Sequence, residues 1–150
     1  MKPHFIQDDG GRSGAGFKGS TGDCVTRAIA IATGVSYSEV YSAINEASEN
    51  ERPGTRKRGK SSARTGVHKP TYRKYLQSLG WTWTPTMAIG SGCKVHLTAS
   101  ELPSGRLIVS VSRHLVAVID GVIHDTHDPS RGGTRCVYGY FSNETVSRKE

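Results

Sequence analysis

Cys24 stands where a cysteine can become a nucleophile. It follows Asp23 and opens a segment, 24–33, whose apolar residues recur at helical spacing, and Gly34 comes directly after that segment. Asp23 suits the N-cap and Gly34 suits a left-handed C-terminal position, so a helix over 24–33 is predicted. In the first turn, unpaired backbone N–H groups and the helix dipole favour the thiolate form of Cys24. A thiolate nucleophile also needs a base, which must come from elsewhere in the chain.

A histidine and a carboxylate occur together on a predicted β-hairpin near the end of the chain. Two apolar segments flank the pair Asp120-Gly121, which is typical of a type I′ turn. A two-residue turn places His114 and Asp125 on the same face as diagonal neighbours on adjacent strands. His114 then serves as the base for Cys24 and Asp125 orients its ring, as acyl transfer through a thioester requires.

Cys24, His114 and Asp125, in this order, resemble the catalytic residues of papain-like cysteine peptidases. Those enzymes have the cysteine at the N-terminus of a long buried helix. Their histidine begins an apolar strand, as in 114–118, and an Asn or Asp ends the next strand, as in 122–125. The compact bacterial and phage members, including the bacteriocin-processing type that also uses Asp, are the most similar.

The resemblance implies a fold and an activity. The fold is a single α+β domain over residues 1–150, with N-terminal helices packed on a C-terminal antiparallel sheet. The activity is cleavage of a peptide or isopeptide bond in a protein or peptide substrate, without a cofactor. Similarity to phage members implies a phage-encoded protein that acts on a host protein.

The chain departs from that family at the second oxyanion-hole donor. The backbone N–H of Cys24 is expected to be one donor. A glutamine six residues before the cysteine usually supplies the other, and here that position is Lys18. Lys18, Ser20 and Thr21 are the candidates for this role, with Gln7 as a further one, and the sequence does not choose among them.

Other interpretations of the same region stay open. Asp128, in an Asp-Pro pair, is an alternative to Asp125 as the third member of the triad. The family's shielding tryptophan is absent after Asp125, where Thr126 and His127 stand. A core histidine and a turn aspartate are the non-catalytic interpretations of the pair.

A metal site is a further alternative for this region. It would be built from His124, His127, Asp128 and Cys136. His124 and His127 point to opposite faces if the strand continues, so no metal site is predicted.

Cys93 and Cys136 are predicted to be free, buried thiols. Three cysteines cannot all pair, and none lies in a C-x-x-C pair. No signal peptide and no apolar stretch long enough to span a bilayer is recognised. We therefore expect a cytoplasmic protein, in the host cytoplasm if it is phage-encoded, with its thiols reduced.

Two further helices are predicted before the sheet. Ser36 and Glu39 form a capping-box pattern at the start of a helix over 37–48. Pro70 lies in the first turn of a helix over about 70–79. Both segments carry an apolar stripe at helical spacing, so both helices are expected to contribute to a core.

The rest of the predicted sheet consists of strands outside the hairpin. These strands cover 81–84, 95–97, 106–111 and 135–141. The two ends of the chain, residues 1–20 and 142–150, are expected to be flexible, because they are rich in glycine or polar residues.

Positive charge is concentrated in the middle of the chain. The net charge is +7, and ten of the 20 Lys and Arg residues lie between Arg52 and Ser100, before the next acid at Glu101. The Gly/Ser-rich basic segment 52–69 is predicted to be a mobile loop with no core residues. Candidates for binding an acidic substrate or partner are Arg56, Lys57, Arg58 and Trp81.

The alternative to an enzyme is a basic, non-catalytic binding protein. Its partner would be nucleic acid or an acidic host protein, attracted by the positive charge. No nucleic-acid-binding motif is present, so this alternative ranks below the peptidase. No membrane partner is predicted, and the sequence does not indicate an oligomeric state.

Overall fold

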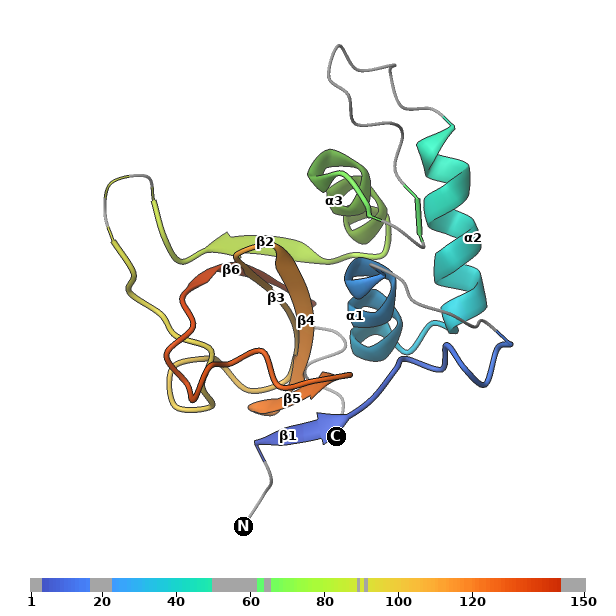
Figure 1. The fold of residues 1–150 in the computed structure, drawn as a ribbon. Helices are drawn as coiled ribbons and strands as arrows, with labels where there is room; N and C mark the ends of the chain where they lie inside the picture. The colour runs from blue at the N-terminus through green and yellow to red at the C-terminus, as the bar shows by residue number, and fades with distance from the viewer. Residues whose placement is uncertain are drawn as a thin grey trace.

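The computed structural model describes residues 4–16, 23–49, 62–63, 66–88, 90 and 92–143. Over these residues the chain forms three helices and one six-stranded sheet, with the strand order β1-β5-β4-β3-β6-β2 (Figure 1). The predicted α+β class is therefore confirmed. The elements are β1 (Phe5–Gln7), α1 (Cys24–Thr33), α2 (Tyr37–Ser48), α3 (Lys69–Ser78), β2 (Thr82–Pro85), β3 (Arg106–Val111), β4 (His114–Ile119), β5 (Val122–Asp125) and β6 (Val137–Ser142).

The three helices begin and end close to the predicted residues. Gly34 ends α1 with φ of 79°, in the left-handed region that glycine adopts without a steric cost. The Ser36 side chain accepts a hydrogen bond from the backbone N–H of Glu39 at 3.2 Å, and α2 begins at the next residue, Tyr37. Pro70 lies in the first turn of α3. None of the helices in the described ranges has the length and apolar composition needed to cross a bilayer.

The hairpin of β4 and β5 has the predicted turn and register. Asp120 and Gly121 have φ of 49° and 80°, as a type I′ turn requires. Ile119 pairs with Val122, and β3 pairs antiparallel with the other edge of β4. The strand expected at 95–97 is reduced to a single bridge between His96 and Cys136.

The first strand corrects the prediction of a flexible N-terminal segment. β1 pairs parallel with β5, and Phe5 lies opposite Ile123 and Gln7 opposite Asp125. This pairing joins residues more than 100 positions apart, so no local turn or period marks a three-residue strand. At the other end, Ser142 belongs to β6 rather than to a tail.

One hydrophobic cluster joins residues of the three helices to residues of β3, β4 and β6. Ala63 belongs to it, is fully buried, and accepts a hydrogen bond from the Thr26 hydroxyl at 2.7 Å. The prediction that segment 52–69 contains no core residue is therefore wrong at Ala63.

Trp81 also belongs to this cluster and is 2% exposed. Its side chain has no surface left for a substrate, so the prediction that Trp81 binds substrate is wrong. The other three binding candidates, Arg56, Lys57 and Arg58, lie outside the described residues.

A second hydrophobic cluster lies on the opposite face of the sheet. Side chains alternate along β3, so Ile108 belongs to the first cluster whereas Leu107 and Val109 belong to the second. Val116 of β4 and Ile123 of β5 complete this face. Burial on both faces explains why the central strands are apolar at nearly every position.

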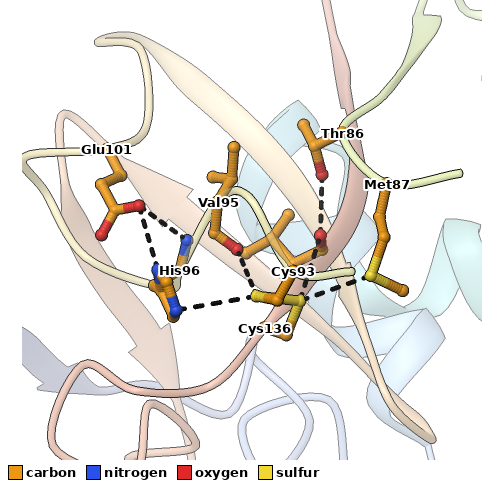
Figure 2. Close-up of a disulfide and its surroundings, with 8 residues drawn as sticks. Thr86, Met87, Cys93, Val95, His96, Glu101 and Cys136 are labelled. Carbon is orange, nitrogen blue, oxygen red and sulfur yellow. Dashed lines mark hydrogen bonds and ion pairs between the residues drawn. A yellow bond between two sulfur atoms is a disulfide. The ribbon is translucent and has the colours of Figure 1, made fainter. Parts of the chain in front are cut away.

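Cys93 and Cys136 form a disulfide, with their Cα atoms 5.8 Å apart (Figure 2). This corrects the prediction that both are free thiols. The connection from β2 to β3 returns beside the start of β6, where His96 bridges to Cys136. The two cysteines are 43 positions apart, and no spacing motif signals that they meet. Cys24 is the free cysteine of the chain.

Candidate active site

Cys24 is the first residue of α1, as predicted. Its backbone N–H is among the four at the start of a helix that have no intrahelical acceptor. Burial by itself would raise the pKa of the Cys24 thiol. The hydrogen bond and charge of His114, the backbone N–H of Leu115 and the charge of Arg27 outweigh burial and lower that pKa. The site therefore favours a thiolate.

His114, the first residue of β4, contacts both other members of the predicted triad. Its Nε2 donates a hydrogen bond to Oδ2 of Asp125 at 2.6 Å, which leaves Nδ1 for the thiol of Cys24. Burial would lower the pKa of His114, but its bonds to Asp125 and Cys24 raise it to about 9. A protonated His114 beside a Cys24 thiolate is the ion pair that these two shifts favour.

Asp125 ends β5 with a side chain that is 3% exposed. Its Oδ2 accepts from His114, and its Oδ1 accepts from the backbone N–H of Thr126 at 2.7 Å and from Arg27 at 3.3 Å. Burial would raise the pKa of Asp125, but these donors and the charge of His114 lower it. Asp128, the alternative third member, instead pairs with Nε2 of His4 at 2.7 Å. Asp125 is thus the one of the two that holds His114.

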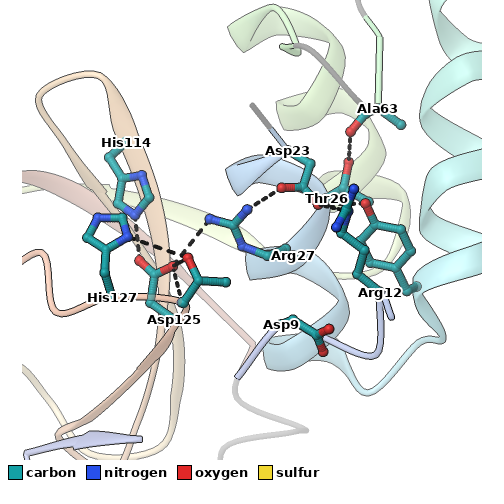
Figure 3. A network of polar contacts seen from close by, with 12 residues as sticks. Asp9, Arg12, Asp23, Thr26, Arg27, Ala63, His114, Asp125 and His127 are labelled. Atoms are coloured by element: carbon teal, nitrogen blue, oxygen red, sulfur yellow. Dashed lines mark hydrogen bonds and ion pairs between the residues drawn. The ribbon is translucent and has the colours of Figure 1, made fainter. Parts of the chain in front are cut away.

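Arg27 connects the predicted triad to a second buried carboxylate (Figure 3). One guanidinium nitrogen bonds to Asp23 and another to Asp125. Asp23 also accepts from the Tyr37 hydroxyl at 2.6 Å and lies 3.6 Å from Nε of Arg12. Arg27 of α1 therefore joins Asp23, just before the helix, to the end of β5 through charge-assisted hydrogen bonds.

The place of Asp23 corrects the prediction that it caps α1. Its side chain makes no capping hydrogen bond to the helix, because the carboxylate is directed to Arg27, Tyr37 and Arg12 instead. The role of Arg27 is not predicted from the sequence. The available signal was a charged residue inside an otherwise apolar helical segment, since such a residue needs a buried partner.

The oxyanion-hole candidates are only partly placed. Lys18, Ser20 and Thr21 lie outside the described residues. Gln7 lies in β1, directly opposite Asp125 of β5, and is exposed. Among the described residues, the position of the Cys24 N–H supports a role as oxyanion donor, because it lies at the start of α1 and has no acceptor within the helix.

The metal-ligand set considered from the sequence is not assembled. His124 bonds to Asp8, Asp128 bonds to His4, and Cys136 is in the disulfide.

A different group could hold a metal ion, because ligand atoms of His114, Asp125 and His127 lie within 4.8 Å of one another. The His127 ring lies 5.5 Å from the His114 ring, beside the bond that joins His114 to Asp125 (Figure 3). A metal ion there would take ligand atoms from the triad, so metal binding and the His114–Asp125 bond compete.

Comparison of the chain with protein-family models, with curated proteins and with solved structures finds no match.

Proposed function

We propose that the protein is a cysteine peptidase or isopeptidase with a papain-like arrangement of its site. The main support for this proposal is that three residues from distant parts of the chain lie together. Cys24 opens α1, His114 bonds to its thiol, and Asp125 holds Nε2 of His114 at 2.6 Å. These are the nucleophile, the base and the orienting group that acyl transfer requires.

In the acylation step, the Cys24 thiolate attacks the carbonyl carbon of the substrate amide. The developing oxyanion faces the N–H groups at the start of α1, with Cys24 N–H as one donor. His114, already protonated, gives its proton to the amine nitrogen as the C–N bond breaks. The amine leaves, and an acyl group remains on Cys24 as a thioester.

In the deacylation step, His114 is neutral and acts as a base. It takes a proton from water while the water oxygen attacks the thioester carbonyl. The C–S bond breaks, the carboxylic acid product leaves, and the thiolate–imidazolium pair is restored. Asp125 keeps the ring orientation through both steps and stabilises the imidazolium form.

The papain-like fold is part of the proposal. In its support, buried residues of α1 share a hydrophobic cluster with Leu115 and Ala117 of β4, the strand that His114 begins. This shared cluster supports packing of the cysteine helix against the histidine strand, as the papain-like fold requires. Phage origin, a host protein as substrate and a cytoplasmic location remain predictions from the sequence.

An activated ester tests the acyl-transfer chemistry without knowledge of the natural substrate. We expect the wild type to release p-nitrophenol from p-nitrophenyl acetate and to carry an acetyl group on Cys24, detected by mass spectrometry of peptides. Cys24→Ala is expected to lose the acetylated peptide and the enzymatic release. His114→Ala is expected to slow both acylation and turnover by about 10²-fold or more.

The matched control is Cys93→Ser, which removes a different sulfur. It is expected to leave acylation of Cys24 intact. A Cys24→Ala variant as active as the wild type, on this ester or on any peptide that the wild type cleaves, would overturn the proposed mechanism.

A further inference from the structure

The Cys93–Cys136 disulfide has a histidine and a carboxylate beside it (Figure 2). Nε2 of His96 lies 3.6 Å from Sγ of Cys93, and Nδ1 of His96 lies 3.1 Å from Oε1 of Glu101. The same Glu101 oxygen accepts from the backbone N–H of His96 at 3.2 Å. Cys93, His96 and Glu101 therefore form a sulfur–imidazole–carboxylate series outside the proposed active site.

Glu101 fixes which nitrogen of His96 faces the sulfur. The hydrogen bonds from His96 lower the pKa of Glu101, so the carboxylate is ionised near neutral pH and accepts a proton from Nδ1. Nε2 is left directed at Cys93. Once His96 is protonated, both ring nitrogens are donors, one to the carboxylate and one to the sulfur.

When His96 is protonated, this environment stabilises a Cys93 thiolate more than it stabilises the disulfide. A disulfide sulfur is neutral and accepts hydrogen bonds weakly, whereas a thiolate beside an imidazolium gains a charge-assisted hydrogen bond. Lys94 adds positive charge at the next position. Stabilisation of the thiolate makes a disulfide easier to reduce and makes Cys93 a better leaving group.

The two sulfurs differ in access. Cys93 is exposed, whereas Cys136 is partly buried and lies against the sulfur of Met87. An external thiol therefore reaches Cys93 first. In the oxidised protein Cys93 is bonded to Cys136, so it is not a second hydrolytic nucleophile.

We propose that Cys93–Cys136 is an exchange-active disulfide whose substrates are solvent thiols and disulfides, with His96 assisting Cys93. In reduction, an external thiolate attacks Cys93 Sγ, the bond to Cys136 breaks, and Cys136 leaves and takes up a proton. A second external thiolate attacks the external sulfur of the mixed disulfide, and Cys93 leaves as a thiolate paired with His96. Two thiols are oxidised to one external disulfide, and the protein disulfide is reduced to two thiols.

Backbone hydrogen bonds join the two segments that carry the cysteines. Leu97 N–H donates to the Arg135 carbonyl at 2.8 Å, and Val137 N–H donates to the Val95 carbonyl at 2.8 Å. These bonds flank the disulfide and involve no cysteine side chain, so we expect them to hold the two segments together in the reduced protein. The dithiol form can then close again, as reversible exchange requires.

The first experiment equilibrates the protein with mixtures of reduced and oxidised glutathione. A Cys24→Ala background removes the third thiol, and the dithiol fraction is counted by mass spectrometry after acid quenching and alkylation. We expect the wild-type pair to convert fully between both forms across the mixtures. His96→Ala is expected to need about tenfold more reducing power, because the reduced Cys93 loses its charge-assisted hydrogen bond. His68→Ala, at the start of α3, is the control and is expected to match the unmodified background.

The second experiment traps the intermediate in single-cysteine variants. Cys136→Ser is expected to accumulate glutathione on Cys93 rapidly, and His96→Ala in that variant is expected to slow this reaction. In the Cys93→Ser variant, Cys136 is expected to react with glutathione slowly. The proposal is overturned if the oxidised protein contains no Cys93–Cys136 disulfide, if His96→Ala titrates like His68→Ala, or if both single-cysteine variants react at the same rate.

Discussion

At the scale of single residues, the charge on Asp125 sets the protonation state of His114. The imidazolium form persists up to a pKa of about 9, so the thiolate–imidazolium pair is lost as pH rises through that value. Asp125→Asn keeps the side-chain shape and removes the charge, which lowers the pKa of His114. On the alkaline side of the pH profile, kcat/KM for p-nitrophenyl acetate is therefore expected to fall at a pH about one unit or more lower than in the wild type; this fall is the alkaline limb of the profile.

Asp128→Asn is the matched control for this change. Asp128 pairs with His4 and does not contact His114, so its variant is expected to keep the wild-type alkaline limb. The assignment of Asp125 as the orienting residue fails if the limb stays in place in Asp125→Asn or moves equally in both variants.

Arg27 is a buried charged residue whose loss is expected to lower stability. Its guanidinium lies between the carboxylates of Asp23 and Asp125, and the side chains of all three are at most 10% exposed. Arg27→Met removes the cation that the two buried carboxylates share, at a cost of about 3–5 kcal/mol in the free energy of unfolding. Urea denaturation measures the loss. The control is Lys74→Met, at an exposed position of α3, which is expected to change stability by less than about 0.5 kcal/mol. An equally small loss for Arg27→Met would contradict the stabilising role of the Asp23–Arg27–Asp125 contacts.

These residues differ in how well the sequence predicts them. The bond of Asp125 to His114 follows from a two-residue turn, because that turn fixes the register of both strands. The bond of Arg27 to Asp125 joins positions 98 apart, so no periodicity or turn can place it. The oxidised state of Cys93 and Cys136 escapes prediction for the same reason.

At the scale of elements, Gly139 lets β2 and β6 approach closely. A Cβ atom at this position would lie 2.4 Å from Cζ2 of Trp83 and 2.8 Å from the Thr84 carbonyl oxygen. Gly139→Ala is therefore expected to lower the free energy of unfolding by about 1–3 kcal/mol, as overpacking does. Thermal and urea unfolding measure it. At Gly14 the nearest heavy atom to an added Cβ is 3.7 Å away, so Gly14→Ala is the control; equal stability of the two variants would contradict the packing.

Elements with local signals are found where the sequence predicts them. The Ser36 cap, the left-handed Gly34 and the Asp120-Gly121 turn each depend on a few neighbouring residues. β1 has no such signal, because it pairs with β5 at the far end of the chain. Ala63 is missed because its burial depends on contacts with α1 and not on its polar surroundings in the sequence.

At the scale of the whole molecule, the uneven charge predicts a preference for acidic substrates. Segment 52–69 carries seven of the 20 Lys and Arg residues of the chain, including Arg56, Lys57 and Arg58. Replacement of these three by Ser is expected to raise KM for an acidic peptide by about tenfold at low salt, with kcat unchanged, because long-range attraction acts on association. Kinetics at two ionic strengths measure the effect.

Arg131→Ser is the control for a single exposed charge outside this segment. It is expected to change KM much less. If the triple variant keeps the KM and salt dependence of the wild type, segment 52–69 has no role in attracting the substrate.

In the proposed mechanism His114 keeps Cys24 as a thiolate, and the rate of alkylation at pH 6 tests this. Cys93 and Cys136 are held in a disulfide in the unreduced protein, so iodoacetamide reports on Cys24 alone. We predict that Cys24 of the wild type reacts far faster than an unperturbed thiol and that His114→Ala slows the reaction by at least about tenfold, since one pKa unit changes the thiolate fraction tenfold. Equal, slow alkylation in both proteins would contradict the account and favour a non-catalytic binding protein.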